Sequence, residues 1–424
     1  MFFSLFSLLV GHLSDTVTVS SSDELAALFA RLGADSSYAT TTTPPPVVNI
    51  RLAAGVYELH VPLTVKASVN ITGAGAAVTI VKCSRVEGRA FDVAASARSF
   101  ALRGVTVVGC ATGAVWVGRD AVRRRTQLQT LNYTLPNAPA PTPWHQLSDV
   151  YYAVDNTANN TANGGGSVVV TDAVFRGNAL SSSELLAAVV VGSRVSDLHV
   201  EGCLFQGNGR ALLSTGAASV TVLDSAFREN GAAAAAAAVR GGGALAAGGA
   251  LALLGGTASV NITDCAFERN TVRLPDAAAA TLGSTARGGA VAIELPSAAT
   301  VALVGCAFAG NSASPTSASL GGDDQDGFAS AMGARGGAVA ATVGPATVVS
   351  VVNCTFDGNA AVGAWGSGGA LSVVSHAVAS VSIRDSVFDG NAAGMSGGAV
   401  AVTTSGDVEV SRRFRANYLV TTVA

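Results

Sequence analysis

Basic and aromatic residues gather between residues 119 and 166, in a stretch that carries no repeat motif. The chemically versatile side chains of this stretch are Arg123, Arg124, Arg125, Tyr133, Trp144, Tyr151 and Tyr152. Guanidinium forks pair with the acidic groups of glycans, and aromatic faces suit sugar rings and cations. These seven residues form the candidate ligand-binding set. The alternative is a loop that folds back and packs its aromatic side chains against the flank of the fold.

An acidic string, GGDDQDG at residues 321–327, is the second candidate for chemistry. Asp323, Asp324 and Asp326 offer the hard carboxylate oxygens that Ca²⁺ prefers. The string lacks the distal glutamate of an EF-hand loop, so a solvated acidic loop is the alternative. Calcium is the one cofactor that the sequence suggests, and no other is expected.

The six cysteines do not form a metal-binding pattern, because no C-x-x-C pair occurs. Cys203, Cys265, Cys306 and Cys354 each precede a repeated phenylalanine by two residues, a place that serine or alanine takes in other copies. This favours a ladder of buried thiols over disulfides. Cys83 and Cys110 end predicted strands, and we expect them to belong to a similar ladder.

Recognisable catalytic motifs are absent from the sequence. The five histidines have no H-E-x-x-H or H-x-H spacing, and no G-x-S-x-G elbow occurs. The predicted strands expose alanine, valine, serine and threonine, whereas a polysaccharide-cleaving groove needs clustered carboxylates or basic residues. No catalytic residue is therefore assigned.

Two short motifs recur along residues 167–417 and must position whatever site exists. One is F-x-x-N, as in DCAFERN (264–270), and the other is a glycine pair followed by small apolar residues, as in GGAVAI (288–293). Their spacing, without helical periodicity between them, predicts short strands. The aligned residues are Phe175 and Asn178, Phe205 and Asn208, Phe227 and Asn230, Phe267 and Asn270, Phe308 and Asn311, Phe356 and Asn359, and Phe388 and Asn391, with a degraded copy at Phe414.

Strands that follow one another so closely, with no helix between them, cannot form βαβ units. A chain that coils and adds one rung per repeat satisfies the pattern, because equivalent positions then stack at the parallel strand spacing. The sequence therefore predicts an all-β, right-handed parallel β-helix of roughly ten or eleven rungs. Each phenylalanine fills the interior, and each asparagine sits at a turn and bonds the neighbouring rung.

The paired G-G-A-[VIL] and F-x-x-N motifs resemble the repeats of chlamydial-type polymorphic outer membrane proteins. That repeat also occurs in right-handed β-helix proteins of the pectin-lyase-like superfamily. The resemblance covers residues 167–417. It implies a secreted or surface-displayed β-helical protein, often linked to adhesion.

The rest of the chain divides around this repeat region. We expect a possible signal peptide at 1–14, with a truncated or mispredicted start as the alternative, and a capping helix and loop at 15–46. Ser21 and Glu24 suggest a capping box for that helix. The first rungs follow at 47–118, the inserted loop at 119–166, the repeat rungs at 167–417 and a tail at 418–424.

Composition limits the partners. Charged residues make up 12% of the chain and its net charge is −3, which argues against nucleic acid. No window predicts a transmembrane helix. The C-terminal end shows no capping element, so self-association through an open strand edge is expected.

The function that these observations favour is a non-catalytic, adhesin-like β-helix repeat protein, extracellular or at the cell surface. Its lateral loops would bind a glycan or a surface protein. The alternative is a polysaccharide lyase or glycoside hydrolase of the pectin-lyase-like fold, since a fold alone does not decide activity.

Overall fold

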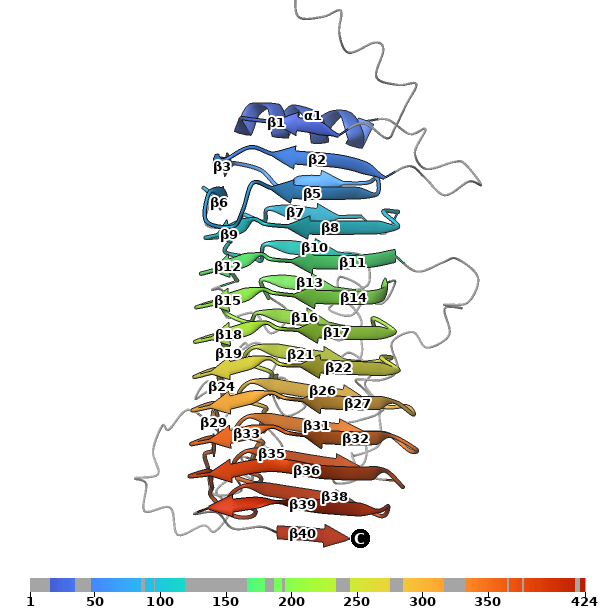
Figure 1. Ribbon diagram of the computed structural model, residues 1–424, viewed down its shortest axis with the longest axis vertical. Helices are drawn as coiled ribbons and strands as arrows, with labels where there is room; N and C mark the ends of the chain where they lie inside the picture. Colours follow the sequence, from blue (N-terminus) through green and yellow to red (C-terminus); the bar gives the residue numbers. More distant parts are fainter. Residues whose placement is uncertain are drawn as a thin grey trace, which may run out of the picture.

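A right-handed parallel β-helix makes up nearly all of the described chain (Figure 1). The computed structural model describes residues 16–34, 47–84, 88–94, 96–118, 166–179, 187–192, 195–233, 245–274, 285–315, 333–363, 366–375, 377–415 and 420–423. With the helix α1 (Ser22–Ala34) at the top of Figure 1, the front strands run left, the strands behind them return right, and each turn descends. This sense of coiling is right-handed, as the repeat predicts.

A 21-stranded parallel sheet forms two sides of the coil. The first strand of each rung belongs to what we call the front row: β1 (Val17–Val19), β2 (Val48–Leu52), β5 (Val69–Gly73), β8 (Ser99–Arg103), β11 (Gly166–Thr171), β14 (Val195–Glu201), β17 (Ser219–Leu223), β22 (Ser259–Thr263), β27 (Thr300–Val304), β32 (Val348–Val352), β36 (Ser380–Asp389) and β39 (Val408–Arg415). The second strand belongs to the side row, which also takes in the second halves of β36 and β39: β3 (Gly55–Leu59), β6 (Thr79–Cys83), β9 (Thr106–Val108), β12 (Val174–Arg176), β15 (Leu204–Gln206), β18 (Ala226–Arg228), β23 (Ala266–Glu268), β28 (Ala307–Ala309) and β33 (Thr355–Asp357).

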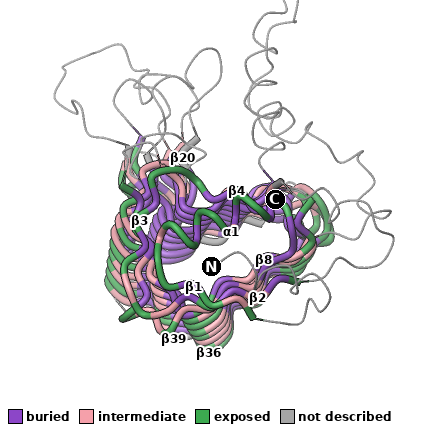
Figure 2. The backbone as a smooth tube through the Cα atoms, turned by 90° about the horizontal axis from the view of Figure 1, so that it is seen from above, coloured by how far each residue is buried: buried purple, intermediate pink, exposed green. Residues whose placement is uncertain are grey.

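An 11-stranded parallel sheet, the back sheet, closes the coil and matches the expected number of rungs. Its strands are β4 (Leu63–Val65), β7 (Phe91–Val93), β10 (Val115–Val117), β13 (Val189–Val191), β16 (Leu212–Ser214), β21 (Leu251–Leu254), β26 (Val291–Leu295), β31 (Val339–Val343), β35 (Leu371–Ser375), β38 (Val400–Thr404) and β40 (Val420–Val423). Figure 2 looks down the axis and shows the buried residues lining the inside of the coil.

Two small sheets, which together we call the annex, lie between the side row and the back sheet in the later rungs. The first contains β19 (Gly231–Ala233), β24 (Thr271–Leu274), β29 (Ser312–Pro315), β34 (Ala360–Ala361) and β37 (Ala392–Ala393). The second contains β20 (Leu245–Ala247), β25 (Thr285–Arg287) and β30 (Gly333–Arg335). In these rungs a short strand follows the asparagine of the F-x-x-N motif directly.

The helix α1 covers the first rung, as expected for a cap. Leu25 and Phe29 are buried, and the Phe29 ring meets that of Phe91 edge-on at 6.4 Å. The helix begins with an N-terminal cap in which Ser21 Oγ accepts the Glu24 N–H at 3.2 Å. The Glu24 carboxylate accepts the N–H of Ser20 at 2.8 Å, and this bond lowers the pKa of Glu24. The polar start and the apolar underside therefore fix the helix on the stack.

The repeated phenylalanines form one column inside the side row. Neighbouring ring centroids lie 4.7 to 4.9 Å apart, and the ring planes are nearly parallel. This interval is the spacing of parallel strands, so each rung places its ring directly on the next. The stacked members are Phe175, Phe205, Phe227, Phe267, Phe308, Phe356 and Phe388.

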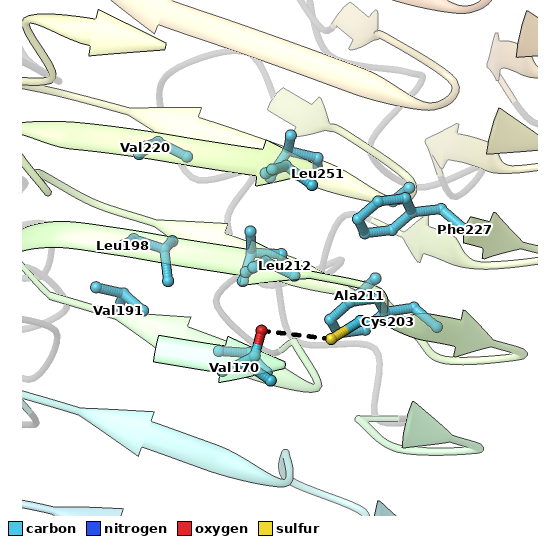
Figure 3. Packing of buried hydrophobic residues seen from close by; sticks show 14 of the residues in the cluster. Val170, Val191, Leu198, Cys203, Ala211, Leu212, Val220, Phe227 and Leu251 are labelled. Atoms are coloured by element: carbon cyan, nitrogen blue, oxygen red, sulfur yellow. Dashed lines mark hydrogen bonds between the residues drawn. The ribbon is translucent and has the colours of Figure 1, made fainter. Parts of the chain in front are cut away.

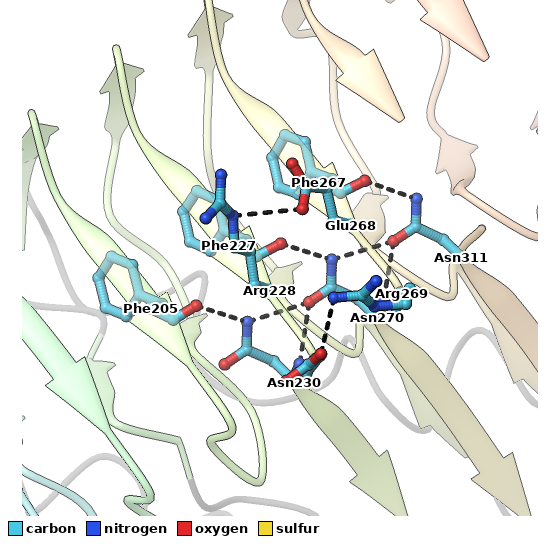
Figure 4. A network of polar contacts seen from close by, with 10 residues as sticks. Phe205, Phe227, Arg228, Asn230, Phe267, Glu268, Arg269, Asn270 and Asn311 are labelled. Carbon is cyan, nitrogen blue, oxygen red and sulfur yellow. Dashed lines mark hydrogen bonds and ion pairs between the residues drawn. The ribbon is translucent and has the colours of Figure 1, made fainter. Parts of the chain in front are cut away.

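The repeated asparagines form a second, buried column beside the phenylalanines (Figure 4). Asn270 Nδ2 donates to the Phe227 carbonyl at 2.9 Å and to Asn311 Oδ1 at 3.0 Å. Asn270 Oδ1 in turn accepts the backbone N–H of Asn230 at 3.1 Å. The members of this ladder are Asn178, Asn208, Asn230, Asn270, Asn311, Asn359 and Asn391.

The cysteines divide into two groups. Cys203, Cys265, Cys306 and Cys354 are free and buried, as the ladder interpretation required. Figure 3 shows Cys203 among buried valines and leucines, with its Sγ 3.5 Å from the carbonyl of Val170. The expectation for the other two was wrong, because Cys83 and Cys110 form a disulfide with Cα atoms 5.0 Å apart. They end neighbouring side-row rungs, which brings their Cα atoms within disulfide range.

Candidate functional site: a charged patch on the front row

The outward side chains of the front row stand in columns, and two of these columns pass through most of the front row. One column passes through Ala101, Val169, His199, Thr221 and Asn261 on successive rungs, as the strand register shows. The other passes through Arg103, Thr171, Glu201, Leu223 and Thr263. Further down, the first column continues with alanine and serine on β27, β32 and β36. From β17 to β32 these two columns carry no charged side chain, but Asn261 and Leu223 depart from the alanine, valine, serine and threonine that the sequence predicted.

Ionisable side chains gather on β8, β11 and β14, where that expectation was wrong. We call this set the front patch; it consists of Arg103, Asp172, Asp197, His199 and Glu201. Arg103 Nε lies 3.1 Å from Asp172 Oδ2, and His199 Nε2 lies 3.0 Å from Glu201 Oε2. Ser196 Oγ donates to Asp197 Oδ2 at 2.7 Å. The patch therefore carries three carboxylates, one arginine and one histidine across three consecutive rungs.

The local backbone holds the two ion pairs next to each other. Asp172 follows β11 at a turn, where its φ is 50°, and its N–H donates to the Glu201 carbonyl at 3.0 Å. The following rung has Gly202 at the equivalent turn, as a later rung has Gly305, whereas the other intact repeat copies have aspartate or asparagine there. A Cβ at Gly202 would lie 2.9 Å from Asp172 Oδ1. Glycine at this position therefore leaves room for the Asp172 carboxylate to meet Arg103.

The front patch is open to solvent. The side chains of Asp172 and Glu201 are 59% and 50% exposed. Beneath the start of these strands lies a void of about 10 Å³ lined by apolar groups such as Phe100, Val168 and Val195, with room for at most one water molecule. The patch is thus an exposed face that can donate and accept hydrogen bonds.

The inserted stretch lies in the sequence between β10 and β11. Residue 118 follows β10 of the back sheet, and residue 166 begins β11, the middle strand of the patch. The candidate ligand-binding residues Arg123, Arg124, Arg125, Tyr133, Trp144, Tyr151 and Tyr152 lie outside the described residues. Their part in binding therefore stays a prediction.

The proposed calcium ligands Asp323, Asp324 and Asp326 also lie outside the described residues. Within the described ranges, no group of three or more histidine, cysteine, aspartate or glutamate side chains could hold a metal ion. None of the described helices is both long and apolar enough to cross a membrane.

Sequence reasoning missed the front patch because its residues are far apart in the chain. Arg103 and Glu201 are separated by the whole inserted stretch, and His199 has no metal-binding or catalytic motif around it. Only the register of β8, β11 and β14 brings these residues together.

Comparisons with known proteins leave the family open. No protein-family profile matches the sequence, and no curated protein matches it. Among solved structures, the catalytic domain of a GH87 α-1,3-glucanase variant in complex with tetrasaccharides is similar, at 11% identity and a TM-score of 0.37. The alignment covers 98% of this chain and 69% of that one. Similarity at this level carries no argument about activity, and the resemblance to polymorphic outer membrane repeats stays a prediction.

Proposed function

We propose that this protein is a secreted or cell-surface β-helix that binds a glycan on its front patch without cleaving it. The observation that carries the proposal is the concentration of one arginine, one histidine and three carboxylates on three consecutive rungs of the front row. Carboxylates and imidazole accept and donate hydrogen bonds to sugar hydroxyls, and Arg103 adds a cationic fork. The adjoining insertion would add aromatic faces from residues such as Tyr133 and Trp144. An adhesin-like role follows from binding of this kind.

The exposure of the carboxylates favours binding over cleavage. A glycosidase needs one carboxyl group that stays protonated near neutral pH, and burial is the usual way to achieve this. Asp172 and Glu201 are half exposed, and each already holds an ion pair with a basic side chain. Neither carboxylate is therefore buried in the way that this mechanism usually requires.

Glycoside hydrolysis is the second candidate function. The observation in its favour is that Asp172 and Glu201 come from adjacent rungs of one exposed face, and hydrolases use two carboxylates that flank the glycosidic bond. A bound chain could approach both groups. Both candidate functions use the front patch. One experiment that measures binding and product formation therefore distinguishes them.

The experiment is a glycan-array screen of the full chain, followed by assays for new reducing ends and for unsaturated products on each glycan that binds. We expect binding without product. His199→Ala and Glu201→Gln should each weaken binding at least about tenfold, the value of roughly one charge-assisted hydrogen bond. Ser350→Ala is the matched control, since Ser350 stands in the same column as His199 on a distant rung.

Two outcomes would reject the binding proposal. Product formation that Glu201→Gln abolishes would establish the hydrolase. Equal binding by the wild type, His199→Ala and Glu201→Gln would place the glycan elsewhere.

A further inference from the structure

The annex has a small core of its own, which fixes the direction of its outer side chains. Ala286 of β25 and Ala334 of β30 are fully buried and pack with Val272 and Leu274 of β24. Side chains alternate along a strand, so the next residue on each strand points to the other side. On β25 and β30 those residues are Arg287 and Arg335, which are paired in register on adjacent rungs.

Arg287 reaches the outer face of the back sheet. Its Nη1 lies 3.1 Å from Glu294 Oε1 on β26 and donates to Thr342 Oγ1 on β31 at 3.3 Å. The Glu294 side chain is 6% exposed and that of Arg287 is 21% exposed. A carboxylate this deep is stable only with its partner, so Glu294 holds Arg287 in place and neutralises it.

Arg335 brings a second positive charge to the same place. Among the described residues, no carboxylate lies within ion-pair distance of it. Burial, together with the charge on Arg287, lowers the pKa of Arg335 to about 10. Both guanidinium groups therefore remain charged at neutral pH, and the cluster of Arg287, Arg335 and Glu294 has a net charge of +1.

Unused hydrogen-bond donors accompany the excess charge. The Nε of Arg287 is buried and has no hydrogen-bond partner among the described residues. A buried donor without a partner costs free energy, and so do two like charges held one rung apart. A single negative group with several oxygens would relieve both costs, because guanidinium groups bind such groups through paired N–H bonds.

We infer that Arg287 and Arg335 form a binding site for one oxyanion, a sulfate, phosphate or carboxylate group. Glu294 orients Arg287, and Thr342 supplies a hydroxyl beside it. The site lies on the annex and the back sheet, apart from the front patch, and the inference does not depend on the proposed function. The group could belong to a free inorganic ion or to an acidic sugar, since both present the same oxygens.

The test is calorimetric titration of the full chain with sodium sulfate at constant ionic strength. Parallel titrations use a sulfated disaccharide and its desulfated counterpart. Sulfate binding alone identifies a free ion as the ligand, and tighter binding of the sulfated disaccharide identifies a sugar group. Either result supports the site. Failure of both to bind would overturn it.

Variants locate the binding. Arg335→Met should weaken sulfate binding at least about tenfold, because it removes the unneutralised charge. Glu294→Gln should strengthen binding about tenfold, because it removes the competing carboxylate. Arg273→Met is the control, since Arg273 is an exposed arginine of the annex on β24.

Thermal unfolding in sulfate gives an independent reading. Sulfate stabilises most proteins by exclusion from their surface, so the informative quantity is the difference between variants. The sulfate-induced rise in Tm should be larger for the wild type than for Arg335→Met, and largest for Glu294→Gln. Equal rises for all three proteins would count against the site. If Arg335→Met does not fold, the sulfate-induced rise in Tm of Glu294→Gln, compared with that of the wild type, still tests the site.

Discussion

In the middle of the ladder, the side-chain amide of each asparagine makes its hydrogen bonds with other groups of the protein. Asn270 Oδ1 accepts two N–H groups of Asn230, and its Nδ2 donates to Phe227 and Asn311. These bonds lie in the buried interior, where a lost partner cannot be replaced by water without cost. The ladder thus ties successive rungs together at a place where strand pairing is interrupted by a turn.

Replacing one such residue should be costly. We expect Asn270→Ala to lower the free energy of unfolding by about 3 kcal/mol, since it leaves the buried Asn230 N–H without its partner and removes the bonds of the amide to Phe227 and Asn311. Urea denaturation measures the loss. The matched control is Asn261→Ala on the same rung, because Asn261 faces outward and bonds only Thr263 Oγ1 in the described structure. Similar losses in the two variants would show that the ladder adds little stability.

The free thiols should be inert in the folded protein. Burial raises the pKa of Cys203 from its ordinary 9.0 to about 12. The unfolded chain ionises this thiol near pH 9 and the folded chain does not, so its contribution to stability is full below pH 9 and is lost as the pH rises through about 12.

We therefore expect the native protein at pH 8 to leave its four free thiols unmodified by Ellman's reagent, while the urea-unfolded protein reacts with all of them. The colour yield at 412 nm counts the reactive thiols. Rapid reaction of the native protein would mean that the side row opens readily.

At the scale of elements, the N-terminal end is held by three different devices. The helix α1 covers the first rung, β1 extends the front row by pairing with β2, and a disulfide links the ends of β6 and β9. Tyr57 of β3 ties β1 to the first rung, because its hydroxyl donates to the Val19 carbonyl at 2.9 Å. This end of the stack therefore has its edge both covered and cross-linked.

The disulfide should contribute measurably to stability. It joins residues 27 positions apart, and a loop of that length corresponds to about 3.5 kcal/mol of chain entropy in the unfolded state. We expect the double variant Cys83→Ala, Cys110→Ala to lose up to about this amount in urea denaturation. Cys203→Ala is the control, because alanine fills the same register at Ala173. If the reduced wild type had the same urea denaturation midpoint as the oxidised wild type, this would contradict the expectation.

The repeat predicts which residues stack but not everything that the stacking brings together. The columns that contain Phe267 and Asn270 follow from counting along the motif. The disulfide was missed because Cys83 and Cys110 lie before the regular repeats, where the rung length could not be counted. The annex was missed because the glycine pair looked like the start of one strand. In the structure it is the corner between β25 and β26.

The candidate sites were missed by sequence reasoning for the same reason. The front patch and the pair of Arg287 and Arg335 arise from register between rungs, and no short motif encodes either of them. The sequence did single out the aromatic and basic residues of 119–166, because their clustering along the chain is local, and their part in binding stays a prediction. A site formed by one stretch of chain can be predicted from local composition. A site formed by residues on several rungs can be predicted only when the register between the strands is known.

At the scale of the whole molecule, the β-helix is a one-dimensional stack in which each rung contacts mainly its neighbours. Stability in such a stack is close to a sum of rung and interface contributions. A local fault between two rungs should then separate the molecule into two blocks. Gly289 offers a place to create one, since a Cβ there would meet the carbonyl of Gly337 on the next rung and lie 2.5 Å from the Ser312 nitrogen.

We expect Gly289→Val to weaken the stack locally by at least about 3 kcal/mol, because the obstructing atoms belong to the backbone and cannot move aside. Hydrogen exchange measured by mass spectrometry should show faster exchange in front-row strands from β27 to β39. Strands from β2 to β17 should keep their protection, because they retain the helical cap and the disulfide. The control is Gly358→Ala, where the added Cβ meets nothing within 4 Å and only the left-handed backbone is strained. If exchange instead quickens equally from β2 to β39 in Gly289→Val, the rungs unfold as one cooperative unit, and the stability of this β-helix is a property of the whole stack.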